Sequence, residues 1–417
     1  DTSTDYYKIQ DAIDNASADD TLHIWAWTYY ENIVIDESIM VIGNGTANTT
    51  VNGTWNRIIT ISSDEVTVKN LKLVSGSNTT SLVYIDAEYA ILEGLEIHGG
   101  YQAIEVKARY AKISDSHVAG QSNTGIQVKA QGLNLQINNS VIRNSENNGI
   151  YVELGANYVD INNNSIHNNS GSGIRFQSAA STIKDNIIVD NNQWGLQING
   201  RSANDIDNVV VNNTILRNND GIRLYKQDSV LLENIINDND RYGVAIDISS
   251  NLYLWNNTIT SNNDYDIILT TSSSVYSVGN IFSSVSVSSD SILTVKSYID
   301  LNVTDARGLN TSGIDISIKE DDSVKYSTEY FGGNDPKTDN NGTIETFLIN
   351  SKEYNGSSTP TVIPTSVSAR SDDWVETNTF DPSNTINITV PDLRVLNTRL
   401  DDSPLYYNIQ TALDNAE

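Results

Sequence analysis

Short runs of alternating apolar and polar residues fill the chain from about residue 60 to residue 282. Each run covers four to six residues. Alternation with a period of two predicts a short β-strand that buries one face. The runs recur every 21 to 27 residues, a repeat too short to close a core alone, so the repeats are predicted to stack as a solenoid. Helical repeats are excluded because the apolar spacing is two.

Two columns of residues define the register of the repeat. One column is Gly followed by an apolar, a variable and an apolar residue, at Gly125, Gly149, Gly173, Gly195, Gly221 and Gly243. The other is Asn two residues before a large apolar residue, at Asn139, Asn164, Asn186, Asn213, Asn234, Asn257 and Asn280. Parallel stacking is expected to place Asn over Asn, so that buried amides bond along the stack. Asn also tolerates the left-handed backbone that a sharp corner needs.

The two ends of the chain resemble each other. Residues 1–17 and 401–417 match without gaps at ten of seventeen positions. An apolar stripe with helical spacing is formed in the first copy by Ile9, Ala12, Ile13 and Ala16, and in the second copy by Ile409, Ala412, Leu413 and Ala416. So short a helix is unstable alone and is predicted to cap another element. We assign residues 1–20 to this capping helix, and residues 392–417 to a linker and the start of a second copy.

Motifs in the first 290 residues carry a resemblance to a known fold family. Residues 9–16, 28–35 and 41–45 resemble the start of right-handed parallel β-helix proteins of the pectate-lyase-like superfamily. Asn-Asn-Ser/Thr-Ile motifs are similar to those of its non-enzymatic prokaryotic and archaeal surface members, and they stand at 163–166, 212–215 and 256–259. The resemblance implies an all-β fold, with a right-handed parallel β-helix over residues 21–290 whose open end is plugged by the N-terminal helix.

The pattern changes after a Ser-rich bridge at residues 283–291. Longer alternating runs follow, at a spacing of about ten residues, and this predicts a β-sandwich. The stretch Thr338–Ile344 resembles the hairpin of Ig-like modules in prokaryotic surface proteins. Residues 291–391 are therefore predicted to form an Ig-like β-sandwich.

Charge excludes two classes of partner. The chain has 25 Lys and Arg against 53 Asp and Glu, a net charge of −28. Without a basic surplus, nucleic acid and anionic membrane surfaces are not expected partners. No apolar run approaches the length that spans a bilayer, so membrane insertion is not expected either. The absence of Cys excludes thiol catalysis. A polar, Asn-rich scaffold of this kind suits an extracellular cell-surface protein.

Outward residues of the Gly column form a stripe that is a candidate ligand-binding face. The stripe contains Gln127, Tyr151, Arg175, Gln197 and Arg223. The resemblance implies that the corresponding face of the superfamily's lyases and hydrolases binds polysaccharide. Hydrolysis needs two converging carboxylates, and the superfamily's lyases pair a calcium-binding acidic cluster with Arg. The stripe has no such acidic cluster, so we predict no catalytic residue and a protein that is not an enzyme.

Other candidate positions carry weaker signals. Asp238, Asp240, Asp264 and Asp266 are weak candidates for Ca²⁺, because oxygen ligands suit this ion. Their spacing fits no known calcium loop and Asp is common in solvated turns, so no metal or other cofactor is expected. Sequons outside the ladder are glycosylation candidates, at Asn44, Asn48, Asn52, Asn78, Asn302, Asn310, Asn341, Asn355 and Asn387.

The favoured interpretation is a structural repeat protein. It is a module of about 400 residues in an extracellular filament, sheath or lattice that copies of the chain assemble head to tail. The first alternative is a carbohydrate-binding adhesin that uses the stripe to bind surface glycans. The second, less favoured, is a polysaccharide lyase or hydrolase.

Overall fold

A computed structural model describes most of the chain. The described residues are 5–53, 56–75, 79–200, 208–226, 229–248, 252–371, 374–381, 386–390, 395–396 and 405–406. Asn78, Ile409, Ala412, Leu413 and Ala416 lie outside them. The chain forms two compact units, Asp1–Leu293 with Asn355–Ser358, and Thr294–Tyr354 with Thr359–Glu417. Among the described residues, no helix has the length and apolar character needed to cross a membrane.

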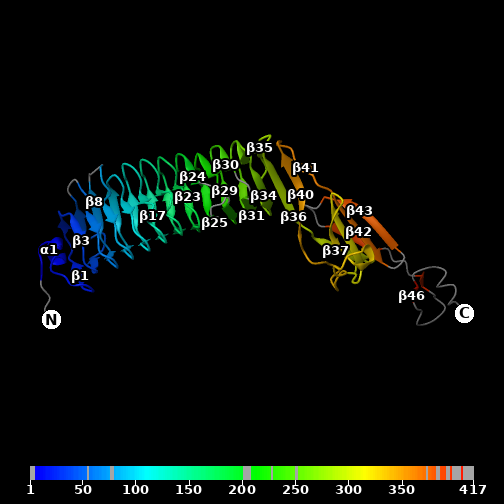
Figure 1. Cartoon of the computed structure of the whole chain (residues 1–417), viewed down its shortest axis with the longest axis horizontal. Helices are drawn as coiled ribbons and strands as arrows, with labels where there is room; N and C mark the ends of the chain where they lie inside the picture. Colours follow the sequence, from blue (N-terminus) through cyan, green and yellow to red (C-terminus); the bar gives the residue numbers. More distant parts are fainter. Residues whose placement is uncertain are drawn as a thin grey trace. The chain divides into compact units, whose positions relative to one another are not determined.

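The first unit is a stack of coils, and each coil except the last contributes one strand to each of three parallel sheets (Figure 1). In spatial order, sheet A contains β1 (Thr21–Ile24), β4 (Met40–Gly43), β7 (Thr67–Lys69), β10 (Ile91–Glu93), β13 (Lys112–Ser114), β16 (Gln136–Asn138), β19 (Asp160–Asn162), β22 (Thr182–Lys184), β25 (Asn208–Val211), β28 (Ser229–Leu232), β31 (Leu252–Trp255) and β34 (Ser274–Val278).

Sheets B and C follow the same order along the stack. Sheet B contains β2 (Thr28–Tyr29), β5 (Thr50–Asn52), β8 (Lys72–Ser75), β11 (Glu96–Gly99), β14 (His117–Ala119), β17 (Val141–Arg143), β20 (Ser165–His167), β23 (Ile187–Val189), β26 (Thr214–Leu216), β29 (Ile235–Asn237) and β32 (Thr258–Thr260). Sheet C contains β3 (Ile33–Ile35), β6 (Ile59–Ile61), β9 (Val83–Ile85), β12 (Ile104–Val106), β15 (Ile126–Val128), β18 (Ile150–Val152), β21 (Ile174–Phe176), β24 (Trp194–Asn199), β27 (Asp220–Tyr225), β30 (Tyr242–Asp247), β33 (Tyr265–Leu269) and β35 (Val285–Val287).

Stacked aliphatic side chains form the core of this unit. Register pairs Ile161 of β19 with Ile183 of β22, and Ile166 of β20 with Ile188 of β23. All four side chains are fully buried. Each apolar residue thus meets its equivalent one coil away, and burial of this continuous column drives the stacking. The predicted parallel β-solenoid is confirmed.

A ladder of buried amides runs beside the apolar columns, at the corner between sheets A and B. Asn213 Nδ2 donates to Asn234 Oδ1 at 3.0 Å, and Asn186 Nδ2 donates to Asn213 Oδ1 at 2.9 Å. The predicted column is confirmed except at Asn139, where the prediction was wrong by one residue. Ser140 holds the ladder position, because its N–H donates to Asn164 Oδ1 at 2.9 Å.

The left-handed backbone belongs to the residue before each ladder Asn. Asn163, Asp185, Asn212 and Asn256 have φ between 53° and 56°, whereas the ladder residues themselves are not among the positive-φ positions. The expectation that the ladder Asn provides the left-handed corner was therefore wrong. Two adjacent residues therefore have different roles. The first provides the left-handed turn, and the side chain of the second forms hydrogen bonds to the neighbouring coils.

A second ladder lies one strand further along each coil, after sheet B. Its members are Asn169, Asn191, Asn218, Asn239 and Asn262, and each Nδ2 donates to the next side chain at 2.9 to 3.3 Å. Asp266 ends the row, accepting from Asn262 Nδ2 at 3.1 Å. The two ladders satisfy buried backbone groups at both ends of the sheet B strands.

A short helix, α1 (Ile9–Ile13), packs on the first coil. Ile9 and Ile13 are buried, while Ala12 and Ala16 are partly buried. The backbone N–H groups of Ile9 and Gln10 donate to the Glu31 carboxylate, each at 3.0 Å. The helix itself is only five residues long, within the predicted span 1–20.

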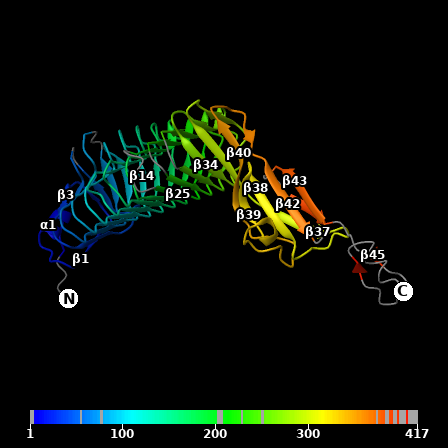
Figure 2. The same ribbon diagram turned by 45° about the vertical axis from the view of Figure 1, so that its right-hand side comes forward.

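The second unit is a smaller β domain. It contains β36 (Ile292–Tyr298), β37 (Leu301–Asp305), β38 (Asp315–Glu320), β39 (Ser323–Ser327), the 3₁₀ turn η1 (Glu329–Phe331), β40 (Leu348–Asn355), β41 (Thr361–Val362), β42 (Thr365–Ser371), β43 (Trp374–Phe380), β44 (Ile386–Val390), β45 (Val395–Leu396) and β46 (Leu405–Tyr406). Strands β39, β38, β42 and β43 form an antiparallel sheet (Figure 2).

Two elements share the core of this domain. The parallel pair β37–β44 supplies Leu301, Val303 and Ile388, and β38 supplies Ile316 and Ile318. Asp315 at the start of β38 is buried and accepts from Lys337 Nζ at 2.9 Å. Burial would raise the pKa of Asp315, but its hydrogen bonds from Lys337 and Thr328 outweigh that effect and lower it. The all-β character is confirmed, and the Ig-like assignment of residues 291–391 stays a prediction.

Candidate functional site

The predicted stripe is one row on the outer face of sheet C. Register pairs Gln127 with Tyr151, Tyr151 with Arg175, Arg175 with Gln197, and Gln197 with Arg223. One residue from each of five successive strands therefore lies in line along the stack. Because parallel neighbours are about 4.8 Å apart, the row presents one side chain at each such step, a spacing suited to an extended polymer.

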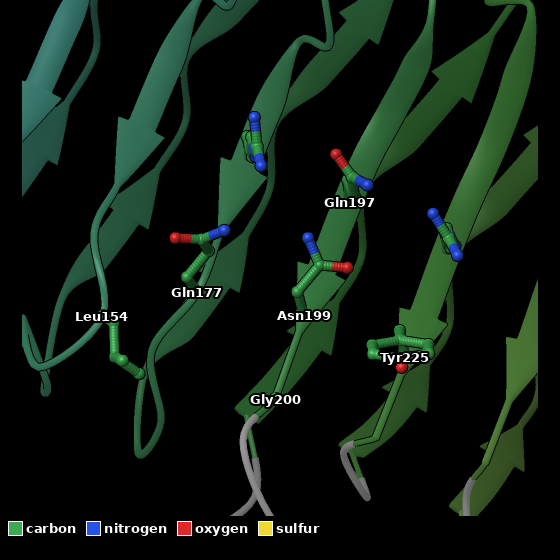
Figure 3. A pocket seen from close by; sticks show the side chains of 8 residues that line it. Leu154, Gln177, Gln197, Asn199, Gly200 and Tyr225 are labelled. Atoms are coloured by element: carbon green, nitrogen blue, oxygen red, sulfur yellow. The ribbon is translucent and has the colours of Figure 1, made fainter.

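Part of this row lines a groove of about 430 Å³. Its walls are formed by Leu154, Arg175, Gln177, Gln197, Asn199, Gly200, Arg223 and Tyr225. Figure 3 shows Gln177 next to the end of β21, Gln197 and Asn199 together on β24, and Tyr225 on β27. Three of the five predicted residues, Arg175, Gln197 and Arg223, are thus brought together. The remaining lining residues were visible in the sequence in two ways. Gln177, Asn199 and Tyr225 are the second outward position of each coil, two residues after the stripe residue, and Leu154 and Gly200 are loop residues.

Gln127 and Tyr151 lie in the same row but outside the groove. Gln127 is 8% exposed and its Nε2 donates to Glu153 Oε1 at 2.6 Å. Its Oε1 accepts from Gln102. The Gln127 amide is therefore used within the protein. Tyr151 instead supports the groove, since its hydroxyl donates to Gln177 Oε1 at 2.9 Å.

Arg175 contributes to the groove a guanidinium whose Nε has no hydrogen-bond partner in the described part of the chain. Its guanidinium lies 5.2 Å from the centre of the Tyr151 ring. Its Nε is buried without a hydrogen-bond partner, and no carboxylate in the described part of the chain forms an ion pair with it. An unsatisfied buried donor is unfavourable by about 1–3 kcal/mol. In a chain of net charge −28, an unpaired cation is a position suited to an anionic ligand.

Arg223, the other cation of the groove, is only weakly paired. Its Nη2 lies 3.9 Å from Asp247 Oδ2, beyond hydrogen-bond distance. The guanidinium also lies 5.8 Å from the Trp194 ring and 5.5 Å from the Tyr225 ring. Aromatic neighbours hold a guanidinium in place while leaving its N–H groups available. Two cations with amides between them can therefore donate to a ligand that carries carboxylates and hydroxyls.

The described residues that line the groove include no carboxylate. Glycoside hydrolysis commonly uses two carboxyl groups that flank the bond. The same residues are mainly hydrogen-bond donors. The geometry suits binding of an acidic sugar polymer, or chemistry at a carbon next to its carboxylate.

The aspartates considered for calcium do not converge. No group of three or more His, Cys, Asp or Glu side chains able to hold a metal ion exists among the described residues. Asp266 is buried and its Oδ2 accepts from Ser283 N–H at 2.8 Å and Ser284 N–H at 3.1 Å. Burial would raise its pKa, but these hydrogen bonds lower it. Asp266 therefore ends a ladder, and Asp238, Asp240 and Asp264 are exposed.

The sequons differ in accessibility. Asn44, Asn48, Asn310, Asn341, Asn355 and Asn387 are exposed, while Asn52 and Asn302 are half-buried. Exposure is a requirement for glycan attachment, so the six exposed sites are the better glycosylation candidates.

The sequence of the β-helix matches a known protein family. The family model described as "Right handed beta helix region" matches residues 56–211 and 204–282, more than half of the chain. The chain belongs to this family. The predicted handedness of the β-helix is thereby confirmed. Among curated proteins, none matches the chain.

Solved structures share the β-helix with this family member. The A-module of the Azotobacter vinelandii mannuronan C-5 epimerase AlgE6 aligns with a TM-score of 0.56 at 15% identity, over 68% of this chain and 93% of that one. The AlgE4 A-module from the same organism gives 0.51 at 15%, over 71% and 86%. A PL6 alginate lyase in complex with a trisaccharide gives 0.50 at 14%, over 65% and 78%.

These comparisons correct one prediction. The chain was expected not to be an enzyme, because the stripe lacks an acidic cluster. The structures that share its β-helix are carbohydrate-active enzymes, so the lack of such a cluster does not exclude enzymatic activity. A missing acidic cluster argues only against calcium-dependent elimination and paired-carboxylate hydrolysis.

A second polar cluster lies on the outer face of sheet B of the β-helix. Arg143 Nε donates to His117 Nε2 at 2.9 Å, and His98 Nε2 lies 2.6 Å from Glu96 Oε1. Lys72 Nζ also binds Glu96 Oε1, at 3.0 Å. Burial lowers the pKa of His117, and the positive charge of Arg143 lowers it further. Burial and Arg143 lower the pKa of His167 in the same way.

These histidines predict a loss of stability in mild acid. Their folded pKa values lie below the ordinary 6.5, so near that pH the unfolded chain binds more protons. The free energy of unfolding should then fall as pH drops below about 6.5. Replacing both residues in H117Q/H167Q should flatten this dependence between about pH 5 and pH 7, measured as urea midpoints by circular dichroism. The exposed His23→Gln variant is the control, and an unchanged slope in the double variant contradicts the assignment.

Proposed function

We propose that this β-helix protein is an extracellular carbohydrate-active protein that binds an acidic polysaccharide along the outer face of sheet C. The observation that carries the proposal is Arg175, a half-buried residue of the groove whose guanidinium has no carboxylate partner among the described residues. A carboxylate of a uronate residue would bind its N–H groups in the bidentate manner typical of Arg.

The groove also fits the rest of such a ligand. Arg175 and Arg223 are two strands apart, about 10 Å at the usual strand spacing. A linear polyuronate lying along the stack can place carboxylates on both cations. The amides of Gln197 and Asn199 then lie between them to bind sugar hydroxyls, and the Tyr225 ring offers a face for a pyranose.

Polymers of uronic acids are the first ligands to test. The neighbours of similar fold are named for mannuronan and alginate, and both are linear chains of carboxylated sugars. Other polyuronates carry the same carboxylates, so a polygalacturonate should also be tested. A neutral mannan serves as the uncharged control. Binding should weaken with added salt, because the main contacts are between exposed or half-exposed charges.

Replacing Arg175 by Gln should weaken binding of mannuronan oligomers about 10- to 100-fold, as expected for loss of a charge-assisted hydrogen bond. Isothermal titration calorimetry measures this change. The matched control is Arg217→Gln, which removes an equal charge from an exposed Arg paired with Asp190 outside the groove. Equal affinity of R175Q and R217Q, or equal binding of the neutral mannan, would falsify the proposal.

Proton abstraction from a bound uronate is a second candidate function, and the pairing of Arg175 with the Tyr151 phenol favours it. A carboxylate neutralised by Arg175 makes the proton on the adjacent carbon more acidic. Tyr151 lies beside the groove and donates to Gln177 Oε1, so as the base it would act in its phenolate form, after its own proton has passed to solvent. The resulting carbanion would take a proton from water on the other face to give an epimer, or expel the glycosidic oxygen, which is protonated by water, to give an unsaturated product. Proton NMR of mannuronan detects both, and Tyr151→Phe should abolish turnover while retaining binding. If neither product forms, the second candidate function is wrong and only the binding function remains.

A further inference from the structure

A row of basic side chains lies on the outer face of sheet B, whereas the groove belongs to sheet C. The alternation of buried and partly buried residues along these strands directs the basic side chains outward. Three of the four His in the chain belong to the row. Five successive strands contribute one residue each, namely Lys72 on β8, His98 on β11, His117 on β14, Arg143 on β17 and His167 on β20. We call these five residues the basic row.

The basic row is bounded along the stack. On the next two strands, β23 and β26, the positions in register with His167 are Val189 and Leu216. On the strand before β8, the residue in register with Lys72 is Thr50. At the usual spacing of about 4.8 Å between parallel neighbours, the row extends over about 19 Å. It is therefore a local feature of one face, with the length of several sugar rings in an extended chain.

The basic row carries more positive than negative charge, although the whole chain has a net charge of −28. One carboxylate, that of Glu96, binds members of the row. It lies 3.0 Å from Lys72 Nζ and 2.6 Å from His98 Nε2. In the part of the chain that the structure describes, no ion pair joins Arg143 to a carboxylate. Lys72 and Arg143 against Glu96 leave one positive charge even when the imidazoles are neutral.

The contact between Arg143 and His117 depends on protonation. Arg143 Nε donates to His117 Nε2 at 2.9 Å, so the neutral imidazole of His117 carries its proton on Nδ1. A proton on Nε2 would turn this acceptor into a donor, and two cationic donors would then face each other. An anion that accepts from both donors would remove their repulsion. Protonation of His117 and anion binding beside Arg143 therefore favour each other.

Charged groups on neighbouring strands act on the His117 imidazole. Burial lowers the pKa of His117, and Arg143 lowers it further. His98 and His167 act on this pKa in the same direction, whereas Glu96 raises it. The basic surroundings therefore keep His117 neutral near neutral pH in the free protein.

His167 follows the same pattern at the end of the row. Burial and Arg143 lower its pKa, and Asp190 raises it. Asp190 is itself paired with Arg217, whose Nε lies 2.8 Å from Asp190 Oδ1. A bound anion would stabilise the protonated imidazoles and raise both pKa values. By linkage, affinity for the anion should increase as the pH falls below the ordinary value of 6.5.

We propose that the basic row is a second binding site, which binds a linear anionic polysaccharide along the stack in mild acid. The carboxylate or sulfate groups of such a ligand would accept from Arg143 and from the protonated imidazoles. A pyranose ring is about as long as one strand step, so successive acidic groups can meet successive members of the row. Nucleic acid, whose charge is denser, is disfavoured by the net charge of −28. The inference does not depend on the groove of sheet C, because the two sites share no residue.

Isothermal titration calorimetry with a dextran sulfate oligomer tests this site, because sulfate groups keep their charge while His titrates between about pH 7.5 and about pH 5.5. The chain carries Arg175→Gln, so that the groove contributes less to binding. It should bind the oligomer at least about tenfold more tightly at the lower pH. Mannuronan oligomers show whether carboxylates replace sulfates, and uncharged dextran should not bind. The result is readable even if the groove binds no sugar, because the described residues that line it include no His.

Two variants of this chain locate the site. Arg143→Gln should weaken binding at the lower pH by about tenfold or more. Arg307→Gln is the matched control, because it removes an equal charge from an exposed Arg that pairs with Asp305 in the second unit. The H117Q/H167Q variant should bind equally well at both pH values, and circular dichroism checks that each variant is folded.

Three results would overturn the proposal. The first is equal affinity of the Arg143→Gln and Arg307→Gln variants at the lower pH. The second is binding that does not change with pH in the chain that keeps its imidazoles. The third is equal binding of a single-stranded oligonucleotide, which would assign the row to polyanions in general.

A second measurement leaves the basic row unchanged. Proton–nitrogen NMR of the imidazoles follows the pKa of His117 with and without saturating dextran sulfate, and the His117→Gln spectrum identifies its signals. The ligand should raise the pKa of His117, as linkage requires if protonation tightens binding. An unchanged pKa would mean that the sulfates bind elsewhere and that the basic row is not the site.

Discussion

Replacing Asn213 by Ala should lower the free energy of unfolding of the β-helix by about 4 kcal/mol, because several buried groups lose their partners together. Asn213 is fully buried. Its Oδ1 accepts from the Asn186 N–H at 3.0 Å and from Asn186 Nδ2 at 2.9 Å. Its Nδ2 donates to Ile183 O, Val211 O and Asn234 Oδ1 at 2.9 to 3.0 Å. Ala removes all five of these bonds in a site that excludes water. Asn234 Oδ1 keeps the N–H of residue 213 and Asn186 Nδ2 keeps Ile161 O, so the loss falls mainly on the Asn186 N–H and the two carbonyl groups.

Asn212 provides a control one residue away. It is exposed, has a φ of 54°, and its Nδ2 donates to Asp185 Oδ1 at 2.6 Å on the surface. Asn212→Gly keeps the left-handed backbone accessible and should change stability by less than about 1 kcal/mol. Urea unfolding followed by far-ultraviolet circular dichroism measures both variants. If N213A unfolds within about 1 kcal/mol of N212G, the ladder does not stabilise the stack as described.

The sequence determined the register of the coils because side chains alternate between faces. A shift of one residue would move every Ile of a strand to the surface, so the apolar columns could be aligned without a structure. The error at Asn139 arose where polar residues adjoin. Asn138, Asn139 and Ser140 offer three neighbouring polar positions, and only hydrogen bonding shows that Ser140 occupies the ladder.

The second ladder was missed although the sequence contains its signal. Asn164 is followed five residues later by Asn169, and the same offset separates Asn186 from Asn191 and Asn213 from Asn218. Five residues carry the chain along one short strand of sheet B to its next corner. Two parallel columns at a fixed offset therefore predict two corners that need the same buried amide.

The candidate site was predicted only as a row. Alternation shows that Arg175, Gln197 and Arg223 face outward on successive coils, but it does not show which outward residues are already paired. Gln127 is held by Gln102 and Glu153, whereas Arg175 has no such partner. Pairing depends on side-chain reach between strands and on the loops at their ends, where Leu154 and Gly200 line the groove.

Gly221→Ala should destabilise the β-helix by about 3 kcal/mol, because the stack has no room for a Cβ at this corner. An added Cβ would lie 2.3 Å from Gly243 O and 2.6 Å from Ile236 Cγ2. Its φ is not in the left-handed region, so space rather than backbone conformation requires Gly. The nearest atom belongs to the backbone of the next coil and cannot move without separating β27 from β30.

The comparison with Gly120→Ala separates crowding from backbone strain. Gly120 has a φ of 76° and no atom within 4 Å of an added Cβ, so Ala there should cost about 1 kcal/mol through conformation alone. Gly221 also precedes Arg223 by two residues on β27. The G221A change should displace this strand and therefore weaken mannuronan binding. The G120A variant should bind mannuronan as the unmodified chain does. Equal urea midpoints for the two variants would show that the coils can separate locally, and that close stacking at the Gly column is not what fixes the groove.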